Sequence, residues 1–186
     1  MSRPIFLVGM PGSGKSTVGR RLAARLGRPF VDGDREIEQR CGVSVATVFE
    51  IEGEAGFRER ETRVLRELAA RPDVVVATGG GAVLRPINRR LMRESGLVLF
   101  LDASLGELWN RLRHDRKRPL LQSEDPRARV AALLAQRRLL YACVASLRVR
   151  SRRQPIERFV GDIMQILEPH LQEPACPVIP TEPPKP

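Results

Sequence analysis

Residues 5–17 read Ile-Phe-Leu-Val-Gly-Met-Pro-Gly-Ser-Gly-Lys-Ser-Thr, an apolar run followed by Gly9-x-x-x-x-Gly14-Lys15-Ser16 and the start of a helix. A strand, a glycine-rich turn and an amphipathic helix in this order are typical of a phosphate-binding loop. The glycines let successive backbone N–H groups turn toward an anion, and the helix directs the positive end of its dipole at the same point. A turn that binds nothing is the alternative, but the flanking strand and helix favour a nucleoside triphosphate.

Each polar residue of this loop has an expected task at the phosphates. We expect Lys15 to reach the β- and γ-phosphates and the Ser16 hydroxyl to bind Mg²⁺. Further contacts to the nucleotide are expected from the neighbouring residues Gly12, Ser13, Gly14 and Thr17. The motif does not indicate which molecule receives the phosphate.

The overall composition favours a single domain with an anionic partner. The chain has 186 residues, of which 42% are hydrophobic, so it is long enough for one domain with a substantial core. Its net charge of +10 at pH 7 favours a negatively charged partner, although arginines spread over solvated helix faces would give the same charge. Nucleic acid is not expected, because no motif supports it and an aromatic content of 4% offers few stacking platforms.

The cysteines and the N-terminus bear on location. Cys41, Cys143 and Cys176 are widely separated, and the histidines are His114 and His170, so neither a zinc site nor a disulfide framework is expected. A signal-peptide pattern is lacking at the start, and no apolar stretch approaches the roughly 20 residues that span a bilayer. We therefore expect a cytoplasmic protein without a membrane partner.

Apolar, β-rich runs alternate with helical patterns along the chain. Strands are predicted near residues 4–9, 29–31, 73–78, 97–101 and 146–150. Helices are predicted near residues 15–26, 34–41, 44–52, 57–70, 86–95, 104–114, 126–145 and 155–168. Continuously apolar runs at 74–77 and 97–101 indicate strands covered on both faces. The alternation predicts a three-layer α/β fold of the P-loop NTPase type, with a five-stranded parallel sheet, helices on both faces and a lid segment.

Two segments break this alternation. Residues 113–126 are charged, end in proline and lie between two predicted helices, so we expect a mobile lid there. Residues 172–186 hold six prolines in fifteen positions with almost no core-forming side chains, as in a disordered tail. We therefore divide the chain into a domain at 1–170 and a Pro-rich disordered tail at 171–186.

Two carboxylates, Asp32 and Asp34, follow the second predicted strand. They fall at the carboxyl edge of the sheet, where folds of this class bind ligands. Phosphoryl transfer needs one carboxylate near Mg²⁺ and another that orients or deprotonates the acceptor hydroxyl. We assign the first task to Asp32 and the second to Asp34, because the third strand ends at Thr78 without an acid. Alternatively, or in addition, Asp34 caps the helix that follows.

A glycine turn and an arginine are further candidates for binding a small ligand. The glycines at 79–81 follow the third strand and allow close approach of a ligand, although a tight turn would use the same residues. Arg58 flanks an apolar helical stripe, and Glu54 and Glu61 lie within one turn of it. Such a glutamate can hold the guanidinium for a ligand carboxylate, but the residues alone favour an ordinary surface ion pair.

Arg137 lies in the apolar stripe of its predicted helix, together with Val130, Tyr141 and Val144. An arginine on this face points inward or into a cleft and must find an anion there. That anion is either a ligand or an internal Asp or Glu.

Taken together, these segments resemble shikimate kinase, a small P-loop kinase related to the nucleoside monophosphate kinases. The resemblance runs in order from Ile5 to about Ile166. The phosphate-binding loop is generic, and the combination of motifs is specific. These motifs are Asp32-x-Asp34, Gly-Phe-Arg58, Thr-Gly-Gly-Gly81 and Lys117-Arg-Pro-Leu-Leu.

The resemblance implies transfer of the ATP γ-phosphate to the 3-hydroxyl of shikimate, in the pathway through chorismate to aromatic amino acids. It implies that Asp34 contacts the ring hydroxyls and acts as a base. Arg58 and Arg137 would hold the shikimate carboxylate, and Gly80 and Gly81 would line the same pocket. The family also implies a monomer.

The resemblance further assigns residues around the nucleotide. Arg118 would swing in with the lid and, with Lys15, act on the transferring phosphoryl group. Arg111 would lie near adenine, and Arg153 and Pro155 would form the other adenine wall.

The chain departs from the family in one motif, because Arg137-Arg138-Leu139-Leu140-Tyr141 stands where the usual pattern is Arg-x-Pro-x-Tyr. Without the proline the helix can bend differently, and Arg138 can compete with Arg137. Three other functions stay open: a kinase for another acid such as gluconate, a nucleic-acid-associated ATPase, and a catalytically silent ATP-binding module.

Overall fold

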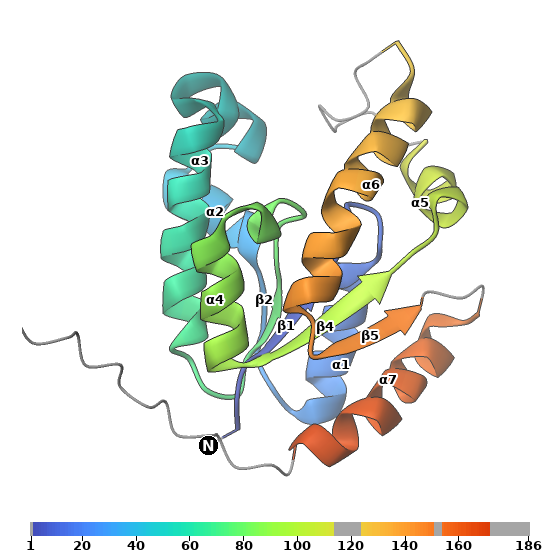
Figure 1. Ribbon diagram of the computed structural model, residues 1–186. Coiled ribbons are helices and arrows are strands. Elements are labelled where there is room, and N and C mark those ends of the chain that lie inside the picture. The colour runs from blue at the N-terminus through green and yellow to red at the C-terminus, as the bar shows by residue number, and fades with distance from the viewer. Residues whose placement is uncertain (1, 114–123, 151–153, 172–186) are drawn as a thin grey trace, which may run out of the picture.

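A computed structural model describes residues 2–113, 124–150 and 154–171, which fold around a five-stranded parallel sheet (Figure 1). The strands are β1 (Ile5–Val8), β2 (Phe30–Asp32), β3 (Val75–Ala77), β4 (Leu97–Asp102) and β5 (Leu147–Arg150). Their order across the sheet is β2-β3-β1-β4-β5, and every neighbouring pair is parallel. The predicted fold class is confirmed.

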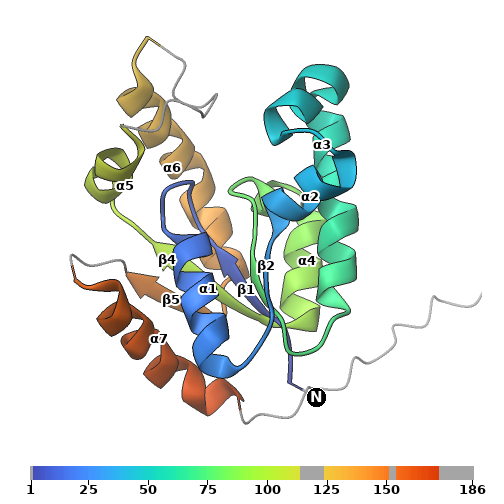
Figure 2. The ribbon, with the colours of Figure 1, turned by 180° about the vertical axis from the view of Figure 1, so that it is seen from behind.

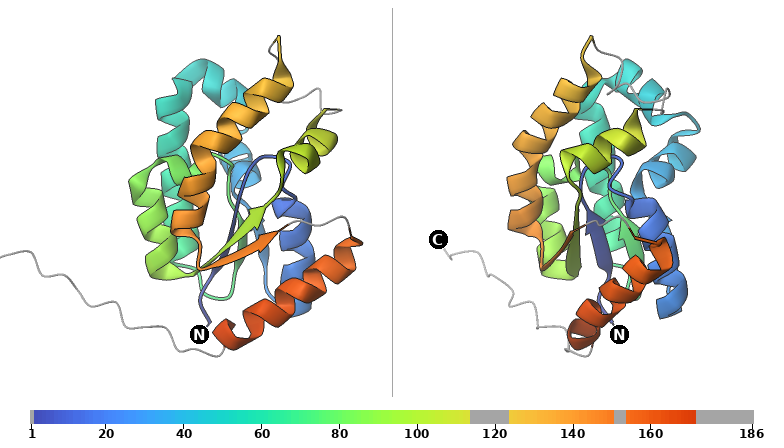
Figure 3. Two further views of the ribbon diagram at one scale, coloured as in Figure 1. Left: turned by 45° about the vertical axis from the view of Figure 1, so that its right-hand side comes forward. Right: turned by 90° about the vertical axis from the view of Figure 1, so that its right-hand side faces the viewer.

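Helices cover both faces of this sheet, which the edge-on view in Figure 3 shows. They are α1 (Lys15–Leu26), α2 (Gly33–Cys41), α3 (Val45–Ala69), α4 (Pro86–Ser95), α5 (Leu105–Leu112), α6 (Pro126–Val144) and α7 (Ile156–Leu171), with a short 3-10 helix at Ala82–Leu84. α1 and α7 lie on one face (Figure 2), whereas α3, α4 and α6 lie on the other.

The alternation of side chains along β1 explains the two layers of core. Ile5 and Leu7 point into the cluster formed with α1 and α7, and Phe6 and Val8 point into the cluster formed with α3, α4 and α6. All four side chains are fully buried, because a parallel sheet with helices on both faces has no solvated side. The central strand therefore carries no polar residue, and polar groups begin where it ends.

The boundaries differ from the prediction mainly in α3. Two helices were predicted at 44–52 and 57–70, but α3 runs from Val45 to Ala69 and is interrupted at Gly53, which has φ 69° and ψ −177°. The two predicted helices are therefore present, and they meet at one glycine with positive φ, which glycine adopts without steric cost. α7 also ends three residues later than predicted, at Leu171.

The start of α2 corrects the capping alternative. Asp32, and not Asp34, is the N-cap residue: its side chain accepts a hydrogen bond from the Arg35 backbone N–H at 3.4 Å. Asp34 lies in the first helical turn. The cap of α2 is therefore made by Asp32, and the carboxylate of Asp34 lies against the glycine turn instead.

The carboxyl ends of the central strands lie level with one another. Ala77 is opposite Leu7 on one side and Asp32 on the other. Thr78 extends this alignment by donating its hydroxyl proton to the Leu7 carbonyl at 3.0 Å. The phosphate-binding loop, Asp32 and the glycine turn therefore meet at one edge of the sheet.

Two predicted segments fall largely outside the described residues. Residues 114–123 of the expected lid and all of 172–186 of the expected tail are in this group. No helix in the described parts of the chain combines the length and the apolar character that membrane crossing requires.

Candidate active site

The loop between β1 and α1 has the backbone shape of a phosphate cradle. Gly9 has φ 148° and Gly14, the N-cap residue of α1, has φ 94°, conformations that residues with a Cβ rarely adopt. A Cβ at Gly9 would also lie 2.7 Å from the Leu101 carbonyl oxygen. These glycines therefore shape the loop, and the amino end of α1 faces the space that it encloses.

Lys15 is held across this loop. Its ammonium group donates hydrogen bonds to the carbonyl oxygens of Gly9 and Met10, at 2.9 and 3.0 Å. The residue is 9% exposed, so the charge is kept in position at the loop with little freedom to move away. An ammonium group placed in this way is suited to a phosphate oxygen.

Ser16 and Asp32 lie side by side at the same edge. The Ser16 hydroxyl donates to Asp32 Oδ2 at 2.5 Å, although the residues are on different elements. A hydroxyl and a carboxylate are the oxygen donors that Mg²⁺ takes in phosphoryl-transfer sites. Across the described residues no group of three or more His, Cys, Asp or Glu side chains could hold a metal, so a cation here would take its other ligands from phosphates and water.

Two carboxylates lie against the first residue of the glycine turn. A Cβ at Gly79 would be 2.6 Å from both Asp34 Oδ1 and Glu61 Oε1. Only a residue without a side chain fits between them, which explains the glycine. The turn therefore brings α2 and α3 into contact with the end of β3.

Arg58 is buried beside this turn, with only 13% of its side chain exposed. It binds Glu61 at 2.8 Å and Glu54 at 3.1 Å, and its guanidinium carbon lies 5.2 Å from the ring centre of Phe57. Burial opposes its charge, but the two glutamates outweigh that effect and raise the pKa of Arg58. The ion pair expected from the sequence exists, but it is buried in the site instead of lying on a solvated surface.

Glu61 was not predicted as a site residue. It is 5% exposed, and burial raises the pKa of its carboxyl group, with Arg58 opposing the shift and Asp34 adding to it. Its Oε1 atom has no hydrogen-bond partner among the described residues. The signal was present in the sequence, because Glu61 follows Phe57 by one turn and so continues the apolar stripe of α3.

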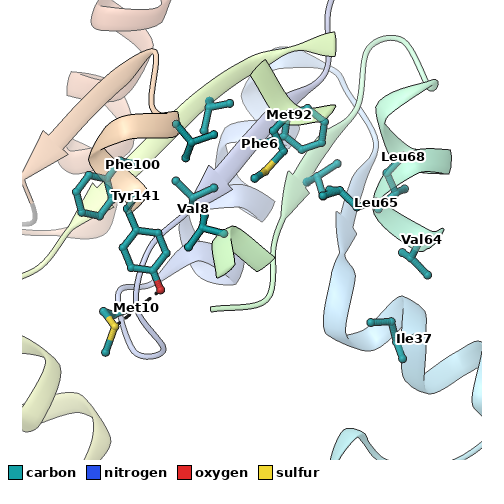
Figure 4. Close-up of a cluster of buried hydrophobic side chains, with 14 of the residues drawn as sticks. Phe6, Val8, Met10, Ile37, Val64, Leu65, Leu68, Met92, Phe100 and Tyr141 are labelled. Atoms are coloured by element: carbon teal, nitrogen blue, oxygen red, sulfur yellow. Dashed lines mark hydrogen bonds between the residues drawn. The ribbon is translucent and has the colours of Figure 1, made fainter. Parts of the chain in front are cut away.

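α6 closes the other side of the glycine turn. Arg137 Nη1 donates to the Gly80 carbonyl at 3.4 Å, and the Tyr141 hydroxyl donates to the same oxygen. Figure 4 shows the Tyr141 hydroxyl pointing to the sulfur of Met10 in the phosphate-binding loop, 3.8 Å away. Burial raises the pKa of Tyr141 to about 12, so the phenol stays protonated and acts as a donor.

Gly80 and Gly81 lie at the centre of this arrangement. A Cβ at Gly81 would collide with the guanidinium group of Arg58, and one at Gly80 would lie 2.7 Å from Pro11. The turn therefore touches the arginine on one side and the phosphate-binding loop on the other. Arg58, Arg137 and the carboxylate of Asp34 surround a surface without side chains, next to a phosphate cradle, which is an arrangement for a small anionic acceptor.

Comparison with known proteins assigns this arrangement to a family. The family model for shikimate kinase matches residues 11–168. The chain belongs to the shikimate kinase family. Its curated relatives include shikimate kinases from Nitrosospira multiformis, 55% identical over 88% of this chain and 84% of the relative, and from Bordetella avium, 52% identical over 89% of this chain and 79% of the relative.

Solved structures agree with this membership. A shikimate kinase from Acinetobacter baumannii in complex with shikimate has a TM-score of 0.88 and 40% identity, covering 93% of this chain and 97% of the other. A gluconokinase from Sinorhizobium meliloti 1021 has a TM-score of 0.59 and 20% identity, covering 92% and 94% of the two chains. The second likeness concerns the fold alone.

The departure from the family pattern in α6 leaves Arg137 at the site. Arg138 points elsewhere and binds Asp102 at 3.0 Å, so it does not compete for the glycine turn. Leu139, which replaces the usual proline, is 78% exposed, and α6 is one uninterrupted helix from Pro126 to Val144.

The residues expected around the nucleotide base are only partly described. Arg111 on α5 donates to the Gly12 carbonyl at 3.2 Å, which brings its guanidinium group over the phosphate-binding loop. Pro155 lies immediately before α7, beyond the end of β5 (Figure 1). Arg118 and Arg153 lie outside the described residues.

Proposed function

We propose that this chain transfers the γ-phosphoryl group of ATP to the 3-hydroxyl of shikimate, giving shikimate 3-phosphate and ADP for the synthesis of chorismate and the aromatic amino acids. One observation carries the proposal: Arg58, Arg137 and Asp34 surround the glycines at 79–81, directly beside the phosphate-binding loop. Membership of the shikimate kinase family supports the identity of the acceptor.

On the nucleotide side, the loop would bind the phosphates through the backbone N–H groups of residues 12–17. Lys15 would exchange its bonds to two loop carbonyls for the β- and γ-phosphates and stabilise the charge that develops during transfer. Arg118 would add a second positive charge there, and Arg111, Arg153 and Pro155 would bind adenine, as the resemblance implies.

Ser16 and Asp32 would hold Mg²⁺ in the complex with ATP, because their oxygens already adjoin. Bound Mg²⁺ neutralises phosphate charge and favours the in-line geometry of transfer. Asp32 keeps its second task, since it caps α2 with its other oxygen.

On the acceptor side, Arg58 and Arg137 would bind the shikimate carboxylate, and Gly80 and Gly81 would let the ring approach the backbone. Asp34 would accept the proton of the 3-hydroxyl as that oxygen attacks the γ-phosphorus. Asp34 would then lie on α2 two residues after Asp32, the carboxylate that would hold Mg²⁺. The start of one helix therefore positions both carboxylates.

The test is an ADP-release assay with ATP and Mg²⁺, to which shikimate, gluconate or duplex DNA is added separately. We expect turnover that depends on shikimate and is absent with the other two additions. Turnover with gluconate alone would indicate a different hydroxy acid, and stimulation by DNA would indicate a nucleic-acid-associated ATPase. No turnover with any addition, although ATP binds, would indicate a catalytically silent module.

The monomeric state and the cytoplasmic location stay predictions. Sedimentation velocity at two protein concentrations tests the first: one species near 21 kDa at both concentrations is expected.

A further inference from the structure

An ion-pair cluster around a buried carboxylate lies outside the proposed site, where β4 and β5 end beside α6. Asp102 is the last residue of β4, and its side chain is 2% exposed. Arg138 from α6 donates to its Oδ2 atom at 3.0 Å, and Arg148 from β5 donates to the same oxygen. One carboxylate thus joins three elements that are far apart in the sequence.

The charges of this cluster are strongly coupled. Burial alone would raise the pKa of Asp102, but hydrogen bonds from Arg138 and Arg148 outweigh it and hold that pKa below its ordinary value. The two arginines are alike in exposure, with 48% and 43% of their side chains exposed. They differ in one respect: Arg138 follows Arg137 on α6, whereas Arg148 belongs to the sheet.

Arg137 contacts the glycine turn weakly and also interacts with Tyr141 and with the charge of Glu61. Its hydrogen bond to the Gly80 carbonyl is long, at 3.4 Å, and its buried Nε atom has no hydrogen-bond partner in the described part of the chain. The direction of this side chain therefore depends on how α6 is rotated about its axis. The buried side chains of α6 set that rotation for the whole helix, and two polar contacts close to Arg137 add to it: Tyr141 with Gly80, and Arg138 with Asp102.

The residue that follows gives little support. Leu139 is 78% exposed, so its packing does not anchor this turn of the helix, and the chain lacks the proline that the family pattern has at this position. The ion pair with Asp102 therefore adds a second tie between this turn of α6 and the sheet, beside the stacking of Tyr141 on Phe100 of β4.

We infer that Asp102 is a positioning residue, which binds Arg138, helps to fix the rotation of α6 and thereby directs Arg137 into the acceptor pocket. This inference rests on the proposed function, because it assumes that Arg137 binds the carboxylate of the acceptor acid. Asp102 itself touches neither substrate.

The test compares Arg138→Leu with Arg148→Leu, which each remove one half-exposed arginine from the same carboxylate oxygen. We expect Arg138→Leu to raise the KM for shikimate by about 3- to 10-fold, as for partial loss of one charge-assisted hydrogen bond, with the KM for ATP unchanged. Arg148→Leu should lower the melting temperature to a similar extent and leave both KM values unchanged. Arg138→Lys should restore part of the shikimate affinity.

A double-mutant cycle with Arg137→Ala separates positioning from general damage. If Arg138 acts through Arg137, then Arg138→Leu should have no further effect on the KM for shikimate in the Arg137→Ala background. Two results would overturn the inference if the unaltered chain turns over shikimate. One is an equal increase of the KM for shikimate in Arg148→Leu. The other is an undiminished effect of Arg138→Leu on that KM in the Arg137→Ala background. Absence of shikimate turnover in the unaltered chain would instead overturn the proposed function, and the inference with it.

Discussion

The phosphate-binding loop and the acceptor pocket lie at the same edge of the sheet but are constructed in different ways. The loop consists of adjacent residues, and its shape comes from main-chain conformation at Gly9 and Gly14. The pocket consists of side chains from α2, α3 and α6 gathered around the glycines at 79–81. Local conformation fixes the first region, whereas packing and ion pairs between distant segments fix the second.

Because of this difference, we expect substitutions to affect the phosphate-binding loop and the acceptor pocket in different ways. We expect a loop of backbone groups to tolerate most side-chain changes except at its glycines, Lys15 and Ser16. A pocket of charged side chains depends on partners such as Glu61, whose own burial is unfavourable unless Arg58 is present. The two regions meet at Gly80, which adjoins Pro11 on one side and accepts hydrogen bonds from α6 on the other.

The largest effect is expected for Asp34→Asn. If Asp34 is the base, kcat should fall by about 10²- to 10⁴-fold, because the amide cannot accept the proton, while ATP binding stays intact. Steady-state kinetics and ATP titration measure the two quantities. Glu36→Gln in the same helical turn, which removes a surface pair with Arg40, is the control and should remain active. Near-normal turnover of Asp34→Asn would remove Asp34 from the chemistry.

Lys15→Met tests the phosphate side. We expect turnover to fall by about 10²- to 10³-fold, because a positioned donor to the developing charge is lost, while shikimate still binds with its normal affinity. Isothermal titration of shikimate checks the second part. Arg20→Met, an exposed residue on the same helix, is the control. A matching loss of shikimate affinity would show that the two regions are not separable in this way.

Arg58→Ala tests the acceptor side. The affinity for shikimate should fall by about 10- to 150-fold, the equivalent of about 1.5–3 kcal/mol for a hydrogen bond to a charged group, with ATP affinity unchanged. Arg60→Ala removes the neighbouring exposed pair with Glu52 and should leave both affinities unchanged. Unaltered shikimate binding by a folded Arg58→Ala protein would mean that the pair with Glu61 is purely structural.

The smallest effect is expected for Glu61→Gln. It concerns how the free energy of unfolding of the ligand-free protein depends on pH. The pKa of Glu61 is raised in the folded chain, so the folded state binds the proton more tightly than the unfolded state. The protonated carboxyl group of Glu61 therefore contributes to stability at low pH. This contribution is lost as the pH rises from the ordinary pKa of 4.5 through the raised pKa of the folded chain. The free energy of unfolding of Glu61→Gln, relative to the unaltered chain, should increase over that window in urea titrations. A constant difference across pH 4–7 would contradict the raised pKa.

Much of the fold was predictable because its signals are local. The continuous apolar runs predicted β3 and β4, and the loop motif predicted β1 and α1 almost to the residue. The break that was predicted between residues 52 and 57 is present as a kink at Gly53, a single residue with positive φ, and the second helix resumes earlier than predicted. The alternative in which Asp34 caps α2 was wrong, because spacing alone cannot tell which of two nearby carboxylates reaches the free N–H groups.

The sequence by itself determined the phosphate-binding loop, the parallel sheet and the side chains that carry charge at its edge, because each depends on neighbouring residues and on the alternation of apolar positions. Only the tertiary structure decided which charges are buried and which distant groups meet. The pair of Arg58 with Glu61 was expected from its spacing, but its burial was not. The hydrogen bond of Arg137 to Gly80 and the ion pair of Arg138 with Asp102 join residues 57 and 36 positions apart. Whether such a pair forms depends on how far each charged group is removed from water, and this is set only when the helices pack on the sheet.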